Sequence, residues 1–307
     1  MRRKQNRKRI KDRTSRSLGS SYLSAFYLDV KVNESRHSFV TGLKFICRLA
    51  ADLEMVRSME PMRGRKPEEE SYVLLLSTMR SGSTLLKALL ATAPDIAHLP
   101  EVNFKKILKS PALQRELEIE NPEPILLLKR PAWFHEIHSY PKIPIGKSLR
   151  RVILLRDVYE TVRSVGKMLG GRHFDRFPGM WGYRLIARHY WAPVTKNLLA
   201  QSAQFPDQVL MIRYEDLLTA PETETARIFK FLGSEQKKGL RRYTTPDNFN
   251  WKWGSDDGSA RIRSHEVQPP RELSPTDWKR KETICSLPGI NKIRDTSGYT
   301  SIYKPIS

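Results

Sequence analysis

SYVLLLSTMRSGSTLLKALLAT, residues 71–92, is the most informative segment of the chain. Tyr72–Leu76 is a continuous apolar run of strand length, which predicts a strand buried on both faces. Ser77–Ser83 is short and polar and contains Gly82, and from Thr84 onward the leucines and alanines follow a helical period. The stretch therefore predicts a strand, a glycine-containing loop and a helix in succession.

The turn between this strand and this helix has the chemistry of an anion socket. The first N–H groups of a helix have no intrahelical partner, and they lie at the positive end of the helix dipole. Gly82 allows the backbone to approach a ligand closely, Ser81, Ser83 and Thr84 add hydroxyl groups, and Arg80 adds a fixed positive charge. The loop predicts a socket for a phosphate-like group, and the alternative is an ordinary serine-capped helix after a strand.

The loop lacks the lysine of a nucleotide-kinase P-loop. The GxxxxGK[ST] motif places a Lys directly after its last Gly, whereas here Ser83 follows Gly82 and Lys87 lies one turn into the helix. RSGSTLL, residues 80–86, instead resembles the 5′-phosphosulfate loop of sulfotransferases that use PAPS (3′-phosphoadenosine 5′-phosphosulfate). That family has a P-loop-like α/β fold and needs no metal. The resemblance implies a set of cofactor-binding residues in this loop: Arg80, Ser81, Gly82, Ser83, Thr84 and Leu85.

The composition is that of a globular protein with an unusual charge. The 307 residues suffice for one large domain or two small ones, and 39% of them are hydrophobic. The net charge of +21 favours polyanionic partners, which include nucleotides, nucleic acid, acidic glycans and anionic membranes. Cys47 and Cys285 form neither a disulfide framework nor a CxxC pair. No signal peptide or membrane anchor is evident, so we expect a cytoplasmic protein, with organelle targeting by the basic N-terminus left open.

The chain divides into three parts by composition. Residues 1–20 hold nine Lys or Arg and one acid, Asp12, and predict a basic disordered arm that acts as a solubilising tail, a targeting segment or a contact for an acidic partner. Residues 21–70 predict a helical segment, with a helix around residues 38–58, and then a linker. The expected sulfotransferase-like domain occupies residues 71–307.

Within this last part, apolar strands alternate with helical stretches. The expected strands are Tyr72–Ser77, Ile125–Lys129, Arg151–Arg156 and Gln208–Arg213. The expected helices are Thr84–Thr92, Glu101–Lys109, Pro111–Glu118, Tyr159–Leu169, Trp181–Ser202, Glu222–Leu232 and Glu272–Leu287. This alternation predicts a three-layer α/β fold, a mostly parallel sheet flanked by helices of the P-loop NTPase-like kind, with ligands at the carboxyl ends of the strands.

RVILLRDVYETVRSV, residues 151–165, carries the second motif. A buried strand ends at Arg156, and Asp157 with Glu160 predicts a capping box for the next helix. In PAPS-dependent sulfotransferases, an Arg at the end of such a strand and a Ser eight residues later hold the 3′-phosphate. Arg156 and Ser164 have this spacing, and a guanidinium can bind phosphate through two parallel hydrogen bonds. For Arg156 alone, the alternative is a surface ion pair.

HLPEVNF, residues 98–104, offers a base for the acceptor hydroxyl. Glu101 resembles the base of tyrosylprotein and bacterial carbohydrate sulfotransferases, the branch closest in layout, and the alternative is a first-turn Glu that stabilises a helix. His98 is the second candidate, although the catalytic His of cytosolic aryl sulfotransferases follows its loop at a longer interval. Lys129 resembles a lysine that contacts the transferring group, the alternative being a strand-terminal Lys in solvent. The resemblance thus implies three catalytic residues: Glu101, Arg80 and Lys129.

Two later segments resemble nucleotide contacts of the same family. Tyr214 opens a Y-E-D-L segment whose Tyr often lies near the nucleotide, and the alternative is a ring at the sheet edge with its hydroxyl in water. Residues 251–262, WKWGSDDGSARI, loosely resemble the loop that closes over the adenine and the 3′-phosphate. The candidates there are Trp253 for stacking and Lys252, Ser259 and Arg261 for phosphate.

The sequence as a whole predicts sulfation of a hydroxyl on a carbohydrate, a peptide tyrosine or a small molecule, with PAPS as donor and a Glu as base. A P-loop-type small-molecule kinase is one alternative, weakened by the missing lysine. A non-catalytic nucleic-acid-binding protein is the other; the charge of +21 suggests it, but the ordered motifs disfavour it. The identity of the acceptor and the formation of a homodimer are left open.

Overall fold

The computed structural model describes residues 72–97, 99, 101–141, 143, 149–176, 178–245 and 260–299. The basic arm expected at residues 1–20 and the segment expected at 21–70 lie outside these residues, as do His98, Lys252, Trp253 and Ser259. All described residues belong to one compact unit, Pro67–Ser307.

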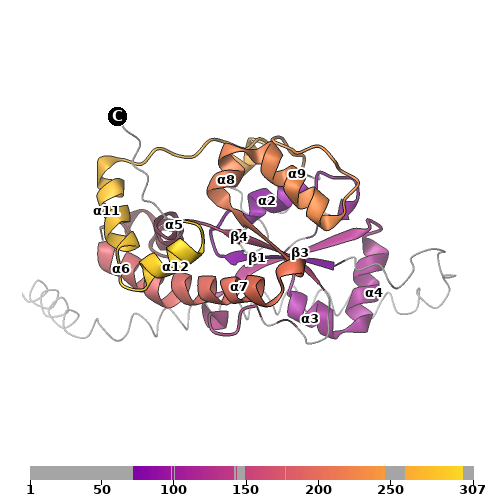
Figure 1. Ribbon diagram of the computed structural model, residues 1–307, viewed down its shortest axis with the longest axis horizontal. Coiled ribbons are helices and arrows are strands. Elements are labelled where there is room, and N and C mark those ends of the chain that lie inside the picture. Colours follow the sequence, from indigo (N-terminus) through magenta and orange to yellow (C-terminus); the bar gives the residue numbers. More distant parts are fainter. Residues whose placement is uncertain are drawn as a thin grey trace, which may run out of the picture. The chain divides into compact units, whose positions relative to one another are not determined.

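The described residues form a five-stranded parallel sheet in the order β2–β3–β1–β4–β5 (Figure 1). Its strands are β1 (Tyr72–Thr78), β2 (Ile96–Ala97), β3 (Ile125–Ala132), β4 (Arg150–Leu155) and β5 (Val209–Arg213). β1 lies at the centre, paired with β3 on one side and β4 on the other. The four predicted strands are confirmed within one to three residues at their ends, and the two-residue edge strand β2 was not predicted.

The central strands are buried on both faces, as their continuous apolar sequence predicts. Successive side chains point to opposite faces, so Val73 and Leu75 join one hydrophobic cluster while Leu74 and Leu76 join the other. The first cluster lies under α2 (Ser83–Leu90), α8 (Tyr214–Thr219), α9 (Pro221–Leu232) and the short α10 (Ala260–Arg263). The second lies under α3 (Phe104–Lys109), α4 (Pro111–Glu120), α5 (Val158–Gly170), α6 (Gly179–Ile186), α7 (Ala192–Gln204), α11 (Pro275–Cys285) and α12 (Ile290–Thr296). Helices therefore cover both faces of the sheet, which confirms the predicted three-layer, P-loop-like α/β fold (Figure 1).

Several helix boundaries differ from the sequence prediction. The stretch predicted as one helix, Trp181–Ser202, is α6 and α7 joined by the π turn η4 (Ala187–Trp191). A π turn keeps the chain helical but widens one turn to i→i+5 hydrogen bonding, and the apolar pattern of this stretch had been interpreted as one uninterrupted helix. The predicted helix at Glu101–Lys109 begins only at Phe104, with Asn103 as its N-cap, so Glu101 is not a first-turn residue.

The predicted capping box at the start of α5 is half right. The Asp157 carboxylate accepts the N–H groups of Tyr159 (3.0 Å) and Glu160 (3.4 Å), as an N-cap should. The backbone N–H of Asp157, however, donates to Glu215 at 3.0 Å, while the Glu160 carboxylate pairs with Arg156. Glu215, which is distant in the sequence, therefore accepts the Asp157 N–H in place of the predicted Glu160.

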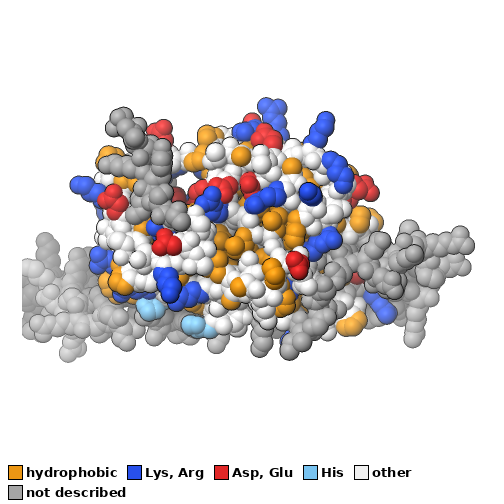
Figure 2. Space-filling view, viewed as in Figure 1, with side chains coloured by type: hydrophobic (Ala, Val, Ile, Leu, Met, Phe, Trp, Pro, Cys, Tyr) orange, Lys and Arg blue, Asp and Glu red, His pale blue; other side chains and the backbone are white. Residues whose placement is uncertain are grey.

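The charge of the described residues is mixed over the face drawn in Figure 2, where basic and acidic side chains are interspersed. Interspersed charges give a weaker long-range field than a patch of one sign. Among the described residues, the helices are too short or too polar to cross a bilayer.

Candidate active site

The loop between β1 and α2 has the backbone geometry of an anion socket. Arg80 (φ 60°) and Gly82 (φ 93°) both adopt left-handed conformations, and Gly82 is the N-cap of α2. The Gly82 carbonyl accepts the Leu86 N–H at 3.2 Å, and within the described residues no side chain caps the helix. The N–H groups of residues 83–85 are therefore those that a helix start leaves without an intrahelical partner.

Buried hydroxyls surround this loop. Ser77, Thr78 and Ser81 are each at most 3% exposed, and their hydroxyl oxygens have no hydrogen-bond partner among the described residues. Burying a polar group without a partner costs about 1–3 kcal/mol. Such a cluster beside an uncapped helix start is expected where a ligand completes the hydrogen bonds.

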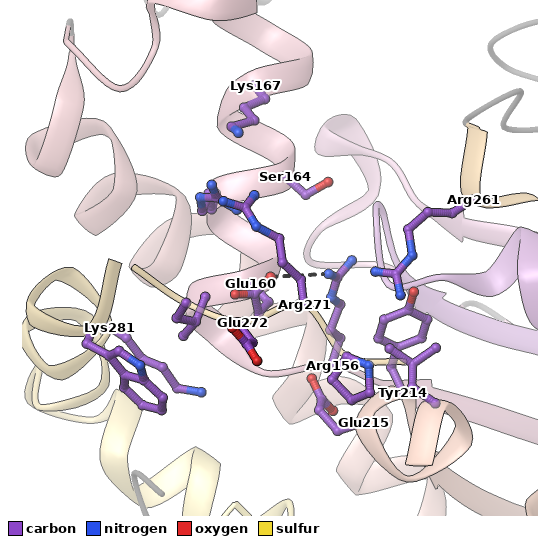
Figure 3. A pocket seen from close by; sticks show the side chains of 15 residues that line it. Arg156, Glu160, Ser164, Lys167, Tyr214, Glu215, Arg261, Arg271, Glu272 and Lys281 are labelled. Atoms are coloured by element: carbon purple, nitrogen blue, oxygen red, sulfur yellow. Dashed lines mark hydrogen bonds and ion pairs between the residues drawn. The ribbon is translucent and has the colours of Figure 1, made fainter. Parts of the chain in front are cut away.

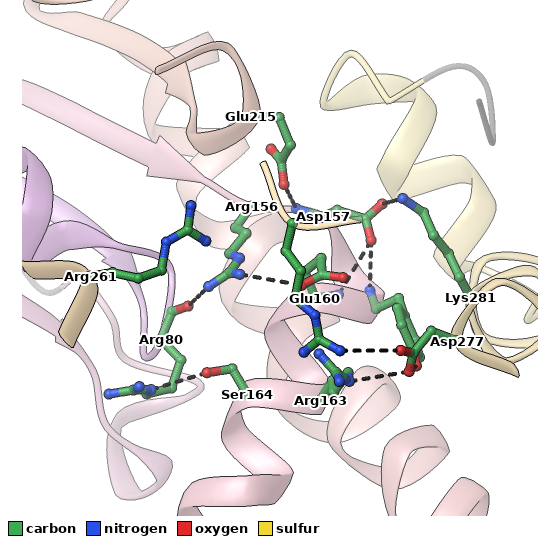
Figure 4. Close-up of polar contacts among 12 residues, drawn as sticks. Arg80, Arg156, Asp157, Glu160, Arg163, Ser164, Glu215, Arg261, Asp277 and Lys281 are labelled. Carbon is green, nitrogen blue, oxygen red and sulfur yellow. Dashed lines mark hydrogen bonds and ion pairs between the residues drawn. The ribbon is translucent and has the colours of Figure 1, made fainter. Parts of the chain in front are cut away.

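Arg156, at the end of β4, lies directly beside this loop (Figure 4). Its Nη1 donates to the Arg80 carbonyl at 2.7 Å, and its guanidinium stands 4.6 Å from the centre of the Tyr214 ring. Arg80 in turn donates from Nε to the Ser164 hydroxyl at 3.2 Å. Four of the predicted cofactor residues, Arg80, Arg156, Ser164 and Tyr214, thus meet at the carboxyl ends of β1, β4 and β5.

Tyr214 packs tightly on the loop. A Cβ atom at Gly82 would lie 2.1 Å from the Tyr214 ring, closer than two carbon atoms can approach. The tyrosine is 8% exposed, held between Gly82 and the guanidinium of Arg156. Tyr214 thus packs against the loop, and position 82 has room only for glycine.

A cavity of about 580 Å³ opens beside Arg156 and Ser164 (Figure 3). Six Lys or Arg and three Glu are among its lining residues, which gives it an excess of positive charge. Figures 3 and 4 show the guanidiniums of Arg156 and Arg261 directed toward one another. Two cations that face each other across a cavity are stabilised by an anion between them, so the predicted role of Arg261 as a phosphate candidate has a geometric basis.

Sequence reasoning missed part of this cavity wall. Arg163 and Lys167 of α5 line it, and so do Arg271, Trp278 and Lys281 from the C-terminal part of the chain. The α5 residues had a signal, because Glu160, Arg163, Ser164 and Lys167 share one helix face at spacings of three and four. The C-terminal residues had none, since only the packing of α11 against α5 brings them to the cavity.

Ion pairs fasten this C-terminal wall to α5. Lys281 and Arg294 lie 3.6 Å and 3.9 Å from the Asp157 carboxylate, and Arg163 lies 3.3 Å from Asp277. Burial raises the pKa of the Glu215 carboxyl, and the neighbouring negative charge of Asp157 raises it further. Lys281 and Arg294 contact the Asp157 carboxylate, and Glu215 accepts the Asp157 N–H. These contacts together fix the start of α5 and Arg156 just before it.

The predicted catalytic residues Glu101 and Lys129 form an ion pair at the other side of the loop, in which Lys129 is buried and Glu101 is partly exposed. The Lys129 Nζ lies 2.5 Å from Glu101 Oε1 and 2.8 Å from the Thr84 hydroxyl in the first turn of α2. Lys129 is 1% exposed and β3 continues to Ala132, so the alternative of a strand-terminal Lys in solvent is wrong. A carboxylate, an ammonium and the start of α2 are thus brought together.

Lys87 has no place in this socket. It is fully buried, and its Nζ donates to the Leu99 carbonyl at 2.8 Å. The kinase alternative would need a lysine at the helix start to reach terminal phosphates. Within the described residues, no group of three or more His, Cys, Asp or Glu side chains is placed to hold a metal ion.

Comparison with known proteins gives consistent matches. A family model described as a sulfotransferase domain matches residues 70–250. A flavonol sulfotransferase-like protein of Flaveria bidentis is 27% identical over 192 residues, which are 56% of this chain and 62% of that protein. The match thus spans less than two thirds of the length of this curated relative.

Two solved sulfotransferase structures resemble this fold. The sulfotransferase domain from the curacin biosynthetic pathway is 20% identical, with a TM-score of 0.44 over 73% of this chain and 98% of that chain. A mouse sulfotransferase complexed with PAP, the desulfated form of PAPS, is 13% identical, with a TM-score of 0.46 over 75% of this chain and 89% of that chain.

Proposed function

The chain belongs to the sulfotransferase family, and we propose that it transfers a sulfuryl group from PAPS to the hydroxyl group of an acceptor. The observation that carries this proposal is the meeting of two anion sites, the helix start at Gly82 and the pair Arg156 and Ser164, joined through Arg80. PAPS carries anionic groups at both its 5′ and its 3′ position, so it requires two such sites side by side.

The residues present fit such a nucleotide. The helix start at Gly82 has no side-chain cap among the described residues, and the Ser81 hydroxyl and the Arg156 Nε are buried atoms without a hydrogen-bond partner among the same residues. The Ser164 oxygen accepts from Arg80, so its O–H remains available to donate to a phosphate oxygen. Each site therefore has unused hydrogen-bonding capacity for an anion.

In this proposal the two sites have separate tasks. Arg80, the N–H groups of residues 83–85 and the hydroxyls of Ser83 and Thr84 hold the 5′-phosphosulfate. Arg156 and Ser164 anchor the 3′-phosphate, with Tyr214 beneath the guanidinium. Bound PAPS supplies an activated sulfuryl group on its 5′-phosphate. Positioning of the anion by fixed donors then lowers the barrier to transfer.

Glu101 acts as the general base in this proposal. Its carboxylate accepts the hydroxyl proton of the acceptor while the acceptor oxygen bonds to sulfur and the bond from sulfur to the bridging phosphate oxygen breaks. Lys129 orients the carboxylate at 2.5 Å and, beside Thr84, places its charge near the bridging oxygen. Together with Arg80 it stabilises the negative charge that develops there.

The acceptor in this proposal is a hydroxyl-bearing carbohydrate, tyrosine peptide or small molecule. Calorimetry with PAP and adenosine 5′-phosphate tests the donor site first. We expect PAP to bind with a Kd of about 1–100 µM, a range usual for enzyme substrates, and adenosine 5′-phosphate to bind at least about tenfold more weakly, since it lacks a charge-assisted phosphate contact.

Sulfuryl transfer from labelled PAPS to a panel of phenols, sugars and tyrosine peptides then identifies the acceptor class. Absence of PAP binding would refute the proposal, and binding of nucleic acid that falls steeply with salt would favour the non-catalytic alternative.

Gly82→Ala is expected to raise the Kd for PAP at least about tenfold, because the added methyl group forces the Tyr214 ring away from Arg156 and overpacks the loop. Calorimetry measures the change. Gly289→Ala is the matched control, since Gly289 is also a helix N-cap with positive φ (81°) but has open space at its Cβ. Both variants lose stability from backbone strain, but only the Gly82 variant should lose PAP. Equal affinity in the two variants would contradict the packing argument.

A further inference from the structure

The π turn between α6 and α7 places two aromatic residues against the loops of the candidate site. Tyr190 and Trp191, at the end of η4, are each 1% exposed. π turns inside α-helices occur frequently at functional sites. Tyr190 contacts the loop between β1 and α2, whereas Trp191 contacts the segment between β4 and α5.

Tyr190 holds the beginning of the β1–α2 loop. Its hydroxyl accepts the backbone N–H of Met79 at 2.5 Å and donates to the Ala132 carbonyl at the end of β3 at 2.8 Å. Met79 directly precedes Arg80, whose positive φ sets the course of the loop. The Tyr190 hydroxyl therefore bridges two strand ends at the point where the anion socket begins.

Trp191 holds the other anion site. Its indole Nε1 donates to the Arg156 carbonyl at 3.2 Å. The backbone of Arg156 is thus fixed by Trp191, while its guanidinium is free to face the cavity and Arg80. One turn of helix connects the two loops through hydrogen bonds to backbone atoms only.

We propose that Tyr190 and Trp191 are positioning residues that hold the phosphosulfate loop and the 3′-phosphate arginine at the separation that one nucleotide requires. The inference rests on the proposed function. The two anionic ends of a nucleotide are joined covalently, so a displaced loop can bind one end only by giving up contacts to the other. A displacement of 1 Å can cost about 100-fold in rate, so such bridges act on catalysis and on binding rather than on packing alone.

The chain contains a matched control for the tyrosine bridge. The hydroxyl of Tyr140, 2% exposed, accepts the Ser77 N–H at 3.0 Å and donates to the Arg130 carbonyl at 2.7 Å. This is the same kind of bridge, two residues earlier along each of the two segments, and it lies within β1 before the turn at Arg80 and Gly82. Tyr140→Phe therefore removes an equivalent buried hydroxyl and reports the purely structural cost.

The test compares Tyr190→Phe, Trp191→Phe and Tyr140→Phe in the full-length protein. We measure the melting temperature, kcat for sulfuryl transfer, and the ratio of the Kd values for adenosine 5′-phosphate and PAP, which isolates the 3′-phosphate contact. Tyr190→Phe is expected to lower kcat by about 10–100-fold with the Kd ratio unchanged. Trp191→Phe is expected to lower the ratio by about fivefold or more, since the loss of a hydrogen bond lets Arg156 shift. Tyr140→Phe should lower the melting temperature by a similar amount. It should leave both kcat and the Kd ratio near their wild-type values.

The outcomes separate the alternatives. Equal losses of kcat in the Tyr190 and Tyr140 variants, or an unchanged Kd ratio in Trp191→Phe, would overturn the positioning role. If Trp191→Phe does not fold, Trp191→Tyr, whose side chain is larger than that of Phe by one hydroxyl group, gives the same ratio measurement. A wild-type protein that binds no PAP would instead refute the proposed function, a result visible before any variant is made.

Discussion

Glu101→Gln is expected to lower kcat by about 10²–10⁴-fold, the usual contribution of a general base, while PAP binds with nearly unchanged affinity. The glutamine keeps a carbonyl oxygen to accept the hydrogen bond from Lys129, which lies 2.5 Å from the carboxylate in the native protein. Glu101→Ala would instead leave the ammonium of Lys129, which is 1% exposed, with the Thr84 hydroxyl but without its charged partner, and leaving a buried charge uncompensated in this way is strongly destabilising. The amide variant therefore separates the loss of the base from the loss of the fold. Single-turnover transfer from labelled PAPS, with calorimetry for PAP, measures both quantities.

Glu136 is the matched control for this experiment. It is a buried glutamate, 8% exposed, that pairs with Lys105 at 3.0 Å and with Arg130 at 3.3 Å. Glu136→Gln removes a carboxylate charge from a comparable ion pair outside the proposed site, so it should cost stability and leave kcat within about twofold of wild type. Wild-type turnover in Glu101→Gln would disprove the base assignment and direct attention to His98. A large loss of PAP affinity would show that Glu101 acts on the nucleotide instead.

The parts of the site that could be predicted from the sequence are those encoded locally. The order of strand, glycine-containing loop and helix at residues 71–92 follows from an apolar run and a change of period. The pair Arg156 and Ser164 was implied by the resemblance of a strand end and the following helix to a sulfotransferase motif, and the structure brings both to Arg80. Features that depend only on a few consecutive residues are therefore predicted correctly from the sequence.

The parts that could not be predicted depend on residues distant in the chain. Glu215 replaces Glu160 as the partner of the Asp157 N–H across 58 residues. Lys281 reaches the cavity only because α11 packs on α5, and the pairing of Glu101 with Lys129 crosses two helices and a strand. The π turn at Tyr190 was not predicted either, because the stretch around it was interpreted as one continuous helix. Tertiary packing determines each of these features. The propensities of nearby residues carry no information about which distant residue becomes the partner.

Arg156→Ala is expected to raise the Kd for PAP by about 100-fold, because a phosphate loses two charge-assisted hydrogen bonds at once. The Nε of this arginine has no partner among the described residues, while its Nη1 supports the Arg80 carbonyl at 2.7 Å. Arg156→Lys keeps the positive charge but loses the planar fork, so its affinity should fall between those of wild type and the alanine variant. Calorimetry with PAP and with adenosine 5′-phosphate gives both affinities.

Arg151→Ala tests whether this loss is specific to the site. Arg151 lies on the same strand, is 2% exposed, stacks 4.3 Å from the Phe205 ring and donates to Gln208 at 3.0 Å. It thus has an aromatic contact and a hydrogen bond like those of Arg156, is more deeply buried than the partly exposed Arg156, and lies at the opposite end of β4. Removing it should lower stability while the Kd for PAP changes little. The preference for PAP over adenosine 5′-phosphate is therefore the decisive quantity: it should fall in Arg156→Ala and stay constant in Arg151→Ala. If Arg156→Ala weakens both nucleotides by the same factor, the arginine serves the loop through Arg80, and the 3′-phosphate must be held by other cations of the cavity.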